Sequence, residues 1–481
     1  GEMLKLPRVE SPHAVYIVLD FGKEILAAPE IEIEGPLGAV VDLGYSEILE
    51  NNRVAPMRQN IPHNDRIILR DGITKHRVFQ PRGFRYVMIR VAGANSPLVI
   101  RDVCAYEAIY PAVRSGSFEA SDSLLDDIYN LCIRTINLCM EDAYTDCPWR
   151  ERNQWLGDMQ PEALFGYYSL DTFDLARKAI REYSGSNTPE GWMPGVFPVT
   201  NPFNLPTWGM RYPVIVWDYY LRTGDVETLQ LSYRAITKQM EWLSKQEDQN
   251  GLIDLTKQPE FQDKYITPSD ASEWFGKNPW YFVDWTLTDS NASDGAVQGW
   301  YLESIKSSAL VAKAAEDDET ALYYDKKAET LADALVKYYW SDDRQAFLKY
   351  RNTLQHRPYN ASADLIGQHE NFLFTALGVG DSEMRKQALD AVKGATGRYL
   401  PNLGNYQSDY NRTEGQRGNI ASEKTVLLGS PFWSFYALLA LMESGHQQAA
   451  LEYIRLGWGL MLEHGATSCW EMWDANTSMC H

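Results

Sequence analysis

Two carboxyl side chains and an indole recur at helical spacing early in the chain. Glu151, Trp155 and Asp158 stand at positions i, i+4 and i+7, and Pro148 suits the first turn of a helix that begins near Asp146. On such a helix the three side chains project from one face. Because two neighbouring carboxyls keep one of the pair protonated near neutral pH, this face predicts acid–base chemistry. The alternative is a solvated face whose charges pair with one another.

A second candidate carboxyl lies near the end of the chain. Glu471 stands between Trp470 and Trp473, after Gly465, in a stretch that reads as a loop. Indoles on both sides would desolvate the carboxyl or leave it fixed by hydrogen bonds for work as a base. The alternative is a buried glutamate satisfied by backbone donors. Glu471 is a candidate mainly because it could supply the partner carboxyl that the first stretch lacks.

Charge and aromatic content limit the class of ligand. The chain of 481 residues has 45 basic and 65 acidic side chains, a net charge of −20. This excess of acid argues against nucleic acid or an anionic membrane surface as the main partner, and favours a neutral ligand. Fifteen Trp and twenty-eight Tyr can fill large cores or stack on the flat faces of sugar rings.

Apolar runs and cysteine spacing are equally restrictive. No apolar run reaches the roughly 20 residues of a membrane span, and the N-terminus resembles no signal peptide, although a removed leader or upstream domain stays open. The six cysteines show neither Cys-x-x-Cys nor metal-ligand spacing, so we expect no metal and no cofactor. Cys132 and Cys139 are expected to be buried thiols. A reducing or weakly oxidising compartment, cytoplasmic or periplasmic, fits this usage, and the oligomeric state is not indicated.

Hydrophobic patterning divides the chain in two. Residues 13–111 contain short β-rich runs broken by Gly-Pro, Asp-Gly and Arg-Gly turns, which predict a β-sandwich. We expect residues 1–115 to form a supporting domain that covers one side of its neighbour. The β-rich runs are 14–22, 30–34, 39–43 and 86–91.

From Ser121 the apolar period changes to about 3.6 residues, which indicates helices. Helix after helix, with long aromatic-rich loops between, predicts a helical-hairpin toroid over residues 116–481. The long loops at 186–210, 262–295 and 400–429 are expected to be ordered and functional. The predicted helices are 121–140, 159–183, 211–223, 225–246, 296–316, 318–340, 362–377, 382–393, 432–443 and 446–462.

The two chemical stretches together resemble the bacterial α-L-rhamnosidases of glycoside hydrolase family seventy-eight. The first signature of that family, Asp-Cys-Pro-x-Arg-Glu followed by Trp and Gly-Asp, matches residues 146–151, Trp155 and 157–158. The second, Gly-Ala-Thr-Thr-x-Trp-Glu-x-Trp-Asp, matches residues 465–474 with Ser468 at the fourth position. Two signatures of this length, in this order, are a specific signal.

This resemblance implies a fold and a reaction. The fold would be mainly α, an (α/α)6 barrel preceded by a β-sandwich, and the reaction the inverting hydrolysis of terminal α-L-rhamnosides. Glu151 would be the general acid and Glu471 the general base, with a water between them. The residues that would hold or wall the sugar are Asp146, Arg150, Trp155, Asp158, Asp284, Trp285, Trp470, Trp473 and His481.

Two alternatives and two departures accompany the resemblance. The chain would otherwise be a related helical-toroid glycosidase for another deoxysugar or a uronide, or a carbohydrate-binding relative without turnover. Where the family usually has Trp-Gly-Asp-Ala, this chain has Trp208-Gly209-Met210-Arg211, so a sugar or aglycone contact is expected to differ. The sequence stops at Cys480-His481, where relatives usually continue into a closing β-domain, so we expect that domain to be absent.

Overall fold

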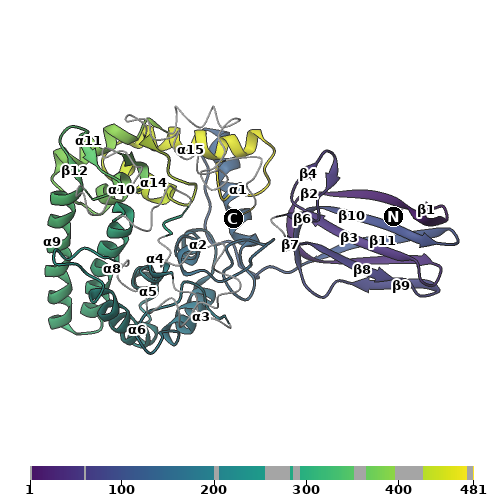
Figure 1. Cartoon of the computed structure of the whole chain (residues 1–481), viewed down its shortest axis with the longest axis horizontal. Helices are drawn as coiled ribbons and strands as arrows, with labels where there is room; N and C mark the ends of the chain where they lie inside the picture. The colour runs from purple at the N-terminus through teal and green to yellow at the C-terminus, as the bar shows by residue number, and fades with distance from the viewer. Residues whose placement is uncertain are drawn as a thin grey trace.

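A sheet-rich N-terminal part and a helical C-terminal part make up the chain, as predicted. The computed structural model describes residues 3–58, 61–199, 205–254, 282–284, 293–351, 365–395, 426–473 and 480. Figure 1 shows the two parts at opposite ends of the long axis, with the N-terminus in the sheet-rich part. None of the helices in the described ranges combines the length and the apolar character that crossing a bilayer requires.

The N-terminal part is a seven-stranded antiparallel sheet with two small ladders beside it. The sheet order is β1-β11-β2-β10-β3-β8, and β9 pairs with β2. The strands are β1 (Leu4–Leu6), β2 (Val9–Gly35), β3 (Val40–Ser46), β4 (Leu49–Glu50), β5 (Arg53–Val54), β6 (Met57–Arg58), β7 (Ile61–Pro62), β8 (Asn64–Ile68), β9 (Gly72–Arg77), β10 (Arg82–Ala94) and β11 (Leu98–Glu107).

Strand β2 organises this sheet. The runs predicted as separate strands at 14–22 and 30–34 belong to this one strand of 27 residues. The first part of β2 pairs with β10, and its last part pairs with β11 and β9. This strand therefore joins β10 to β11 and β9 within one sheet. Ile31 and Ile33 face the core, while Glu32 between them pairs with Arg101 on the surface. This is the alternation that a half-buried strand requires.

The helical part contains twelve helices within the described ranges, most of them where the 3.6-residue period places them. They are α1 (Ser123–Leu138), α2 (Leu156–Ser169), α3 (Phe173–Ser184), α4 (Pro206–Gly209), α5 (Tyr212–Thr223), α6 (Val226–Ser244), α8 (Gly295–Ala314), α9 (Asp318–Tyr339), α10 (Gln368–Ala376), α11 (Ser382–Val392), α14 (Ser434–Glu443) and α15 (Gln447–Glu463). Short strand pairs lie between them: β12 (Trp340–Ser341) with β13 (Ala346–Phe347), and β14 (Ile366–Gly367) with β15 (Val426–Leu427).

Neighbouring helices pack in a continuous series. Helix α2 contacts α5, α5 contacts α8, α8 contacts α10, and α10 contacts α14. Others flank this series, since α3 contacts α5 and α6, α9 packs on α8, and α15 contacts α14 and α1. Figure 1 shows α9 at the end far from the sheet, and α1 and α2 nearer to it. One hydrophobic core runs through all these elements, and the sheet has its own.

The helix predicted from Asp146 is wrong over its first ten residues. Helix α2 begins at Leu156, with Trp155 in the extended conformation at its N-cap. Arg152 has φ +52°, a left-handed conformation that a helix interior does not admit. Asp146 Oδ1 accepts the backbone N–H of Asn153 at 2.9 Å, so this carboxylate closes a loop rather than a helical turn. The three side chains predicted for one helical face therefore do not share one.

The helix predicted over 159–183 is two helices. Leu170 is extended, and it forms a bridge with Arg114, which ends α2. The backbone N–H of Asp171 then donates to the backbone carbonyl of Val113, and α3 begins after Thr172. Gly166 lets this turn pack closely, because a Cβ there would lie 2.4 Å from the Thr172 hydroxyl. Pairing with Val113 and Arg114 thus overrides the local helical period.

Candidate active site

Arg150 joins the two candidate carboxyls. Its Nη2 donates to Glu471 Oε1 at 2.7 Å, and its Nε donates to Glu151 Oε1 at 3.1 Å. Glu471 is 321 positions away in sequence, so the contact brings together the two ends of the helical part. The side chains of Arg150 and Glu471 are 7% and 5% exposed, whereas that of Glu151 is 36% exposed. One carboxyl is thus buried with the cation, and the other is open to a ligand.

Arg150 carries the positive charge of this cluster. Burial opposes ionisation of the guanidinium, yet the carboxylate of Glu471 outweighs burial, with help from Glu151, and the pKa of Arg150 is raised. Arginine is therefore a permanent cation here. A cation in contact with a buried carboxylate favours the ionised form of that carboxylate. This arrangement suits Glu471 as a proton acceptor.

Trp155 contacts Glu151 directly. Its indole Nε1 donates to Glu151 Oε2 at 2.9 Å, so the two side chains predicted to be neighbours are neighbours through a loop and not through a helical turn. With Arg150 on one carboxyl oxygen and the indole on the other, the orientation of Glu151 is fixed from two sides. A half-exposed carboxyl that is held in this way can meet a ligand without rearrangement.

The other two aspartates of the first motif have separate environments. Asp146 closes the loop onto Asn153 and is almost fully buried. Asp158 Oδ2 accepts the indole N–H of Trp208 at 3.1 Å. Gly157 makes this approach possible, because a Cβ there would lie 2.3 Å from the Trp208 ring. Trp208, at the start of the departing tetrapeptide, is therefore a neighbour of the site that the motif spacing did not reveal.

The tryptophans of the second motif are buried beside Glu471. Trp473 Nε1 donates to the backbone carbonyl of Gly429 at 2.8 Å, and its ring packs so tightly on α15 that a Cβ at Gly457 would lie 2.6 Å from it. Trp470 meets His464 edge to face, with ring centroids 5.9 Å apart. This loop is therefore held against the preceding helix.

Asp284 reaches the same region from a distant segment. Its carboxylate accepts the hydroxyl of Ser430, the residue after the glycine that Trp473 bonds. Asp284 has φ +64°, a conformation that a non-glycine residue adopts at a cost. Ser430 was not among the residues that the sequence predicted for the site. The predicted site residues Trp285 and His481 lie outside the described residues.

A buried ionic group also lies at the starts of two helices. Lys349 Nζ is 2.9 Å from Asp294 Oδ2, and both side chains are 1% exposed. Asp294 caps α8, and Glu370, fully buried in the first turn of α10, bonds the backbone N–H of Gly367. Burial raises the pKa of Glu370 to about 7. Strand and helix periodicity give no signal for these residues.

Two family models match this chain. Residues 113–396, more than half of the chain, match the bacterial alpha-L-rhamnosidase 6 hairpin glycosidase domain. The chain belongs to the bacterial alpha-L-rhamnosidases. Residues 11–108 of this rhamnosidase-family chain match the bacterial alpha-L-rhamnosidase concanavalin-like domain. The first match includes Glu151 and ends before Glu471, so the contact through Arg150 adds the second motif to the site.

Individual alpha-L-rhamnosidases are distant in sequence and similar in fold. One from Alteromonas sp. (strain LOR) is 22% identical over 360 residues, 74% of this chain and 38% of the relative. The GH78 family rhamnosidase of Bacillus sp. GL1 has a TM-score of 0.80 at 22% identity, over 100% of this chain and 46% of that one. A rhamnosidase from Klebsiella oxytoca with rhamnose bound has a TM-score of 0.73 at 17% identity, over 98% and 85%. The chain thus spans less than half the length of the first two.

The departure from the rhamnosidase pattern at Arg211 has a structural consequence. The Arg211 side chain is fully buried, and its Nε donates to Gln160 Oε1 at 2.8 Å while its Nη2 pairs with Glu303 at 2.5 Å. The guanidinium also lies 5.0 Å from the centre of the Trp300 ring. These contacts place Arg211 in an ion pair within the helical core.

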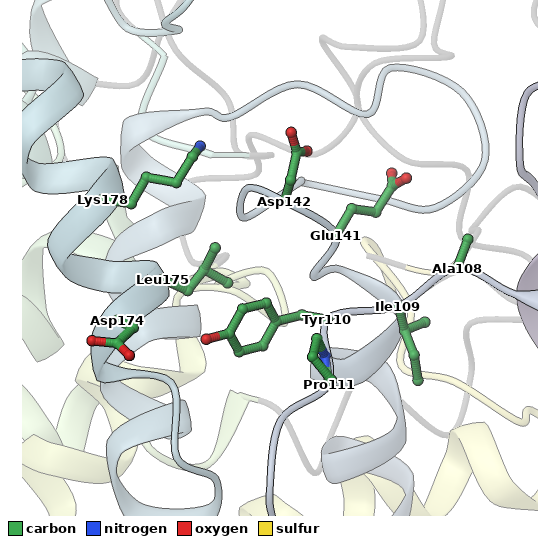
Figure 2. A pocket seen from close by; sticks show the side chains of 9 residues that line it. All are labelled: Ala108, Ile109, Tyr110, Pro111, Glu141, Asp142, Asp174, Leu175 and Lys178. Carbon is green, nitrogen blue, oxygen red and sulfur yellow. The ribbon is translucent and has the colours of Figure 1, made fainter.

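A separate pocket of about 600 Å³ lies between the linker that follows the sheet and α3 (Figure 2). Tyr110 and Leu175 lie beside each other, with Glu141 and Asp142 on the loop above them. None of the candidate catalytic side chains lines it. Its lining residues are Ala108, Ile109, Tyr110, Pro111, Glu141, Asp142, Asp174, Leu175 and Lys178.

Proposed function

We propose that this chain removes terminal α-L-rhamnose from rhamnosides, with Glu151 as the general acid and Glu471 as the general base. The observation that carries the proposal is the guanidinium of Arg150, which bonds both carboxyls and so unites two motifs that lie far apart in sequence. Membership in the bacterial alpha-L-rhamnosidases supplies the sugar and the bond type. Neutral rhamnosides also suit a protein of net charge −20.

The exposures of the two carboxyls support these roles. A general acid must approach the glycosidic oxygen of an incoming substrate, and Glu151 is the more exposed of the pair. A general base must be ionised, and Glu471 is buried against a permanent cation. In the reaction Glu151 would protonate the leaving oxygen while Glu471 takes a proton from the attacking water. Inversion at the anomeric carbon is the finer part of the proposal and rests on the motif resemblance.

The remaining motif residues would hold the sugar. We propose that Trp155 packs against the ring or its methyl group, since its indole lies beside the acid. Asp158, held by Trp208, would accept hydroxyl hydrogen bonds. The other proposed sugar contacts are Asp146, Arg150, Asp284, Trp285, Trp470, Trp473 and His481.

We also propose the finer architecture. The continuous helix series α2, α5, α8, α10 and α14, flanked by further helices, is what the inner ring of an (α/α)6 barrel would give. The single long strand β2, paired at both ends with different strands, suits a β-sandwich. The boundary would fall between residues 115 and 116, close to the start of the glycosidase-domain match at residue 113 and after the end of the other match at residue 108. A TM-score of 0.80 against a solved rhamnosidase supports this arrangement.

Release of p-nitrophenol from a panel of aryl glycosides tests the function. The panel contains p-nitrophenyl α-L-rhamnoside, other aryl deoxyglycosides and an aryl uronide, each incubated with the chain as it stands. We expect turnover on the rhamnoside, and at least about tenfold lower kcat/KM on every other substrate. Preference for another glycoside would assign a different sugar. Rhamnose binding without any release would instead make the chain a carbohydrate-binding relative.

A further inference from the structure

The loop that carries Arg150 and Glu151 touches the N-terminal sheet domain on both sides of that pair. Trp149 precedes the pair and Arg152 follows it, and each of these two side chains reaches a different part of the sheet domain. The catalytic pair is therefore held between two anchors, and neither anchor is one of the residues assigned to the sugar or to proton transfer. These contacts assign a role to the sheet domain.

The first anchor is an aromatic stack. The rings of His63 and Trp149 lie 3.8 Å apart between centroids at an interplanar angle of 21°, and both residues are buried. Beside them β10 approaches the loop backbone, because a Cβ at Gly83 would lie 2.6 Å from the carbonyl oxygen of Pro148. Only a glycine leaves room for this approach. The sheet domain thus fits the shape of the loop immediately before Arg150.

The second anchor is the Arg152 guanidinium. Its Nη1 donates to the backbone carbonyl of Pro81, at the edge of the sheet domain, at 2.7 Å. Its Nε donates to Glu141 Oε1 at 3.0 Å, and its Nη2 also contacts this carboxylate. The left-handed φ of +52° turns the chain at this residue. Such a conformation persists where surrounding contacts impose it, and the fork of Arg152 supplies them.

We propose that the sheet domain is a structural part of the active site, with Arg152 as a positioning residue that, together with the His63–Trp149 stack, fixes the orientation of Glu151. This inference rests on the proposed function, because it assigns a task to the general acid of that reaction. Glu151 is half exposed, so burial alone does not hold it. A displacement of about 1 Å at a reacting group can reduce turnover about 100-fold.

Two pairs of variants test the proposal. Arg152→Lys keeps the charge and loses the planar fork that binds Pro81 and Glu141 together. Its control is Arg134→Lys, because Arg134 also crosses the domain boundary, to the carbonyl of Glu24, without touching the loop. Kinetics are compared on p-nitrophenyl α-L-rhamnoside and on a rhamnosyl disaccharide. Backbone hydrogen exchange is followed over residues 146–155.

The second pair acts from the sheet side. Gly83→Ala places a methyl group against the backbone of Pro148, whereas Gly44→Ala places one at the same distance, 2.6 Å, from the end of the Met88 side chain within the sheet itself. We expect Arg152→Lys and Gly83→Ala to speed amide exchange in 146–155 at least about tenfold. They should also lower kcat on the disaccharide about 10- to 100-fold, with a smaller loss on the aryl substrate, because a good leaving group depends less on the acid. The controls should change neither quantity.

The two measurements keep this inference separate from the proposed function. Hydrogen exchange follows the loop without reference to turnover. Unchanged exchange in 146–155 for both Arg152→Lys and Gly83→Ala would overturn the positioning role, whatever the activity. Equal kinetic losses for these variants and for their controls would also overturn it, since general domain docking would then explain them. A chain that hydrolyses no rhamnoside, but whose loop loosens as expected, would contradict the proposed function alone.

Discussion

Replacing Arg150 by glutamine should disturb catalysis and stability in a way that separates its two roles. The change removes the cation that contacts Glu471 at 2.7 Å and Glu151 at 3.1 Å, and it leaves a shorter, neutral polar side chain. Glu471 would stay buried, with its side chain 5% exposed, but without this cation. Removing one partner of a buried ion pair costs about 3–5 kcal/mol in the free energy of unfolding.

The same change should move the pH dependence of catalysis. An opposite charge within about 4–6 Å lowers the pKa of a carboxyl by about 1–3 units, so losing it favours the protonated base. The acidic limb of the kcat/KM profile, which reports the base in the free enzyme, should therefore move to higher pH by about 1–3 units. The sign follows from the role of Glu471 as an acceptor, since a protonated acceptor is inactive.

Initial rates on p-nitrophenyl α-L-rhamnoside between about pH 3 and 9, together with denaturant unfolding, measure both effects. A matched control is Arg222→Gln, which breaks the ion pair of Arg222 with Asp218 at 3.3 Å near the end of α5. The control should lose some stability and leave the acidic limb in place. An Arg150→Gln protein that is destabilised and keeps the wild-type acidic limb would refute the reasoning, because Arg150 would then serve stability alone.

Three further results are expected. Glu151→Gln and Glu471→Gln should each lower turnover about 10²- to 10⁴-fold without unfolding the protein. The turnover of Glu151→Gln should fall less on an aryl substrate than on a disaccharide. A variant with wild-type turnover would exclude that residue from its catalytic role. Burial and two nearby arginines lower the pKa of His63 to about 4, so the contribution of neutral His63 to stability is complete above about pH 6.5 and is lost toward pH 4. In urea titrations the stability advantage of the wild type over His63→Gln should therefore shrink by up to about 3 kcal/mol between these pH values. A difference that stays constant with pH would contradict this. Gly157→Ala should cost about 1–3 kcal/mol in the same titrations, because its Cβ would overlap the Trp208 ring, and an unchanged midpoint would show that the ring can move.

The sequence predicted the helices best where capping and period agree. The helix predicted over 318–340 is Asp318–Tyr339, and the one over 382–393 is Ser382–Val392. In both, an aspartate accepts a backbone N–H of the first turn, Asp317 from Thr320 and Asp381 from Met384. These interactions are local, so spacing along the chain reveals them. The coarse division into a sheet-rich and a helical part followed from the same kind of signal.

Interactions between distant segments explain the wrong predictions. Pro148 suits a first helical turn, but Arg152 bonds Glu141 and Pro81 and takes a left-handed conformation, so the segment is a loop. No local rule anticipates a carbonyl 71 positions away. The candidate site was predicted through its two motifs. The residue that unites them, Arg150, was predicted only as a sugar contact, because its contact with Glu471 spans 321 positions.

The anomer first released from p-nitrophenyl α-L-rhamnoside tests the central claim most directly. A proton NMR time course with the chain as it stands detects both the cleavage of the rhamnoside and the configuration of the new hemiacetal. If Glu151 protonates the leaving oxygen while Glu471 activates water on the opposite face, β-L-rhamnose should appear first and the α-anomer only later, by mutarotation. The α-anomer appearing first would contradict this account, because it would require a covalent intermediate and a different task for Glu471.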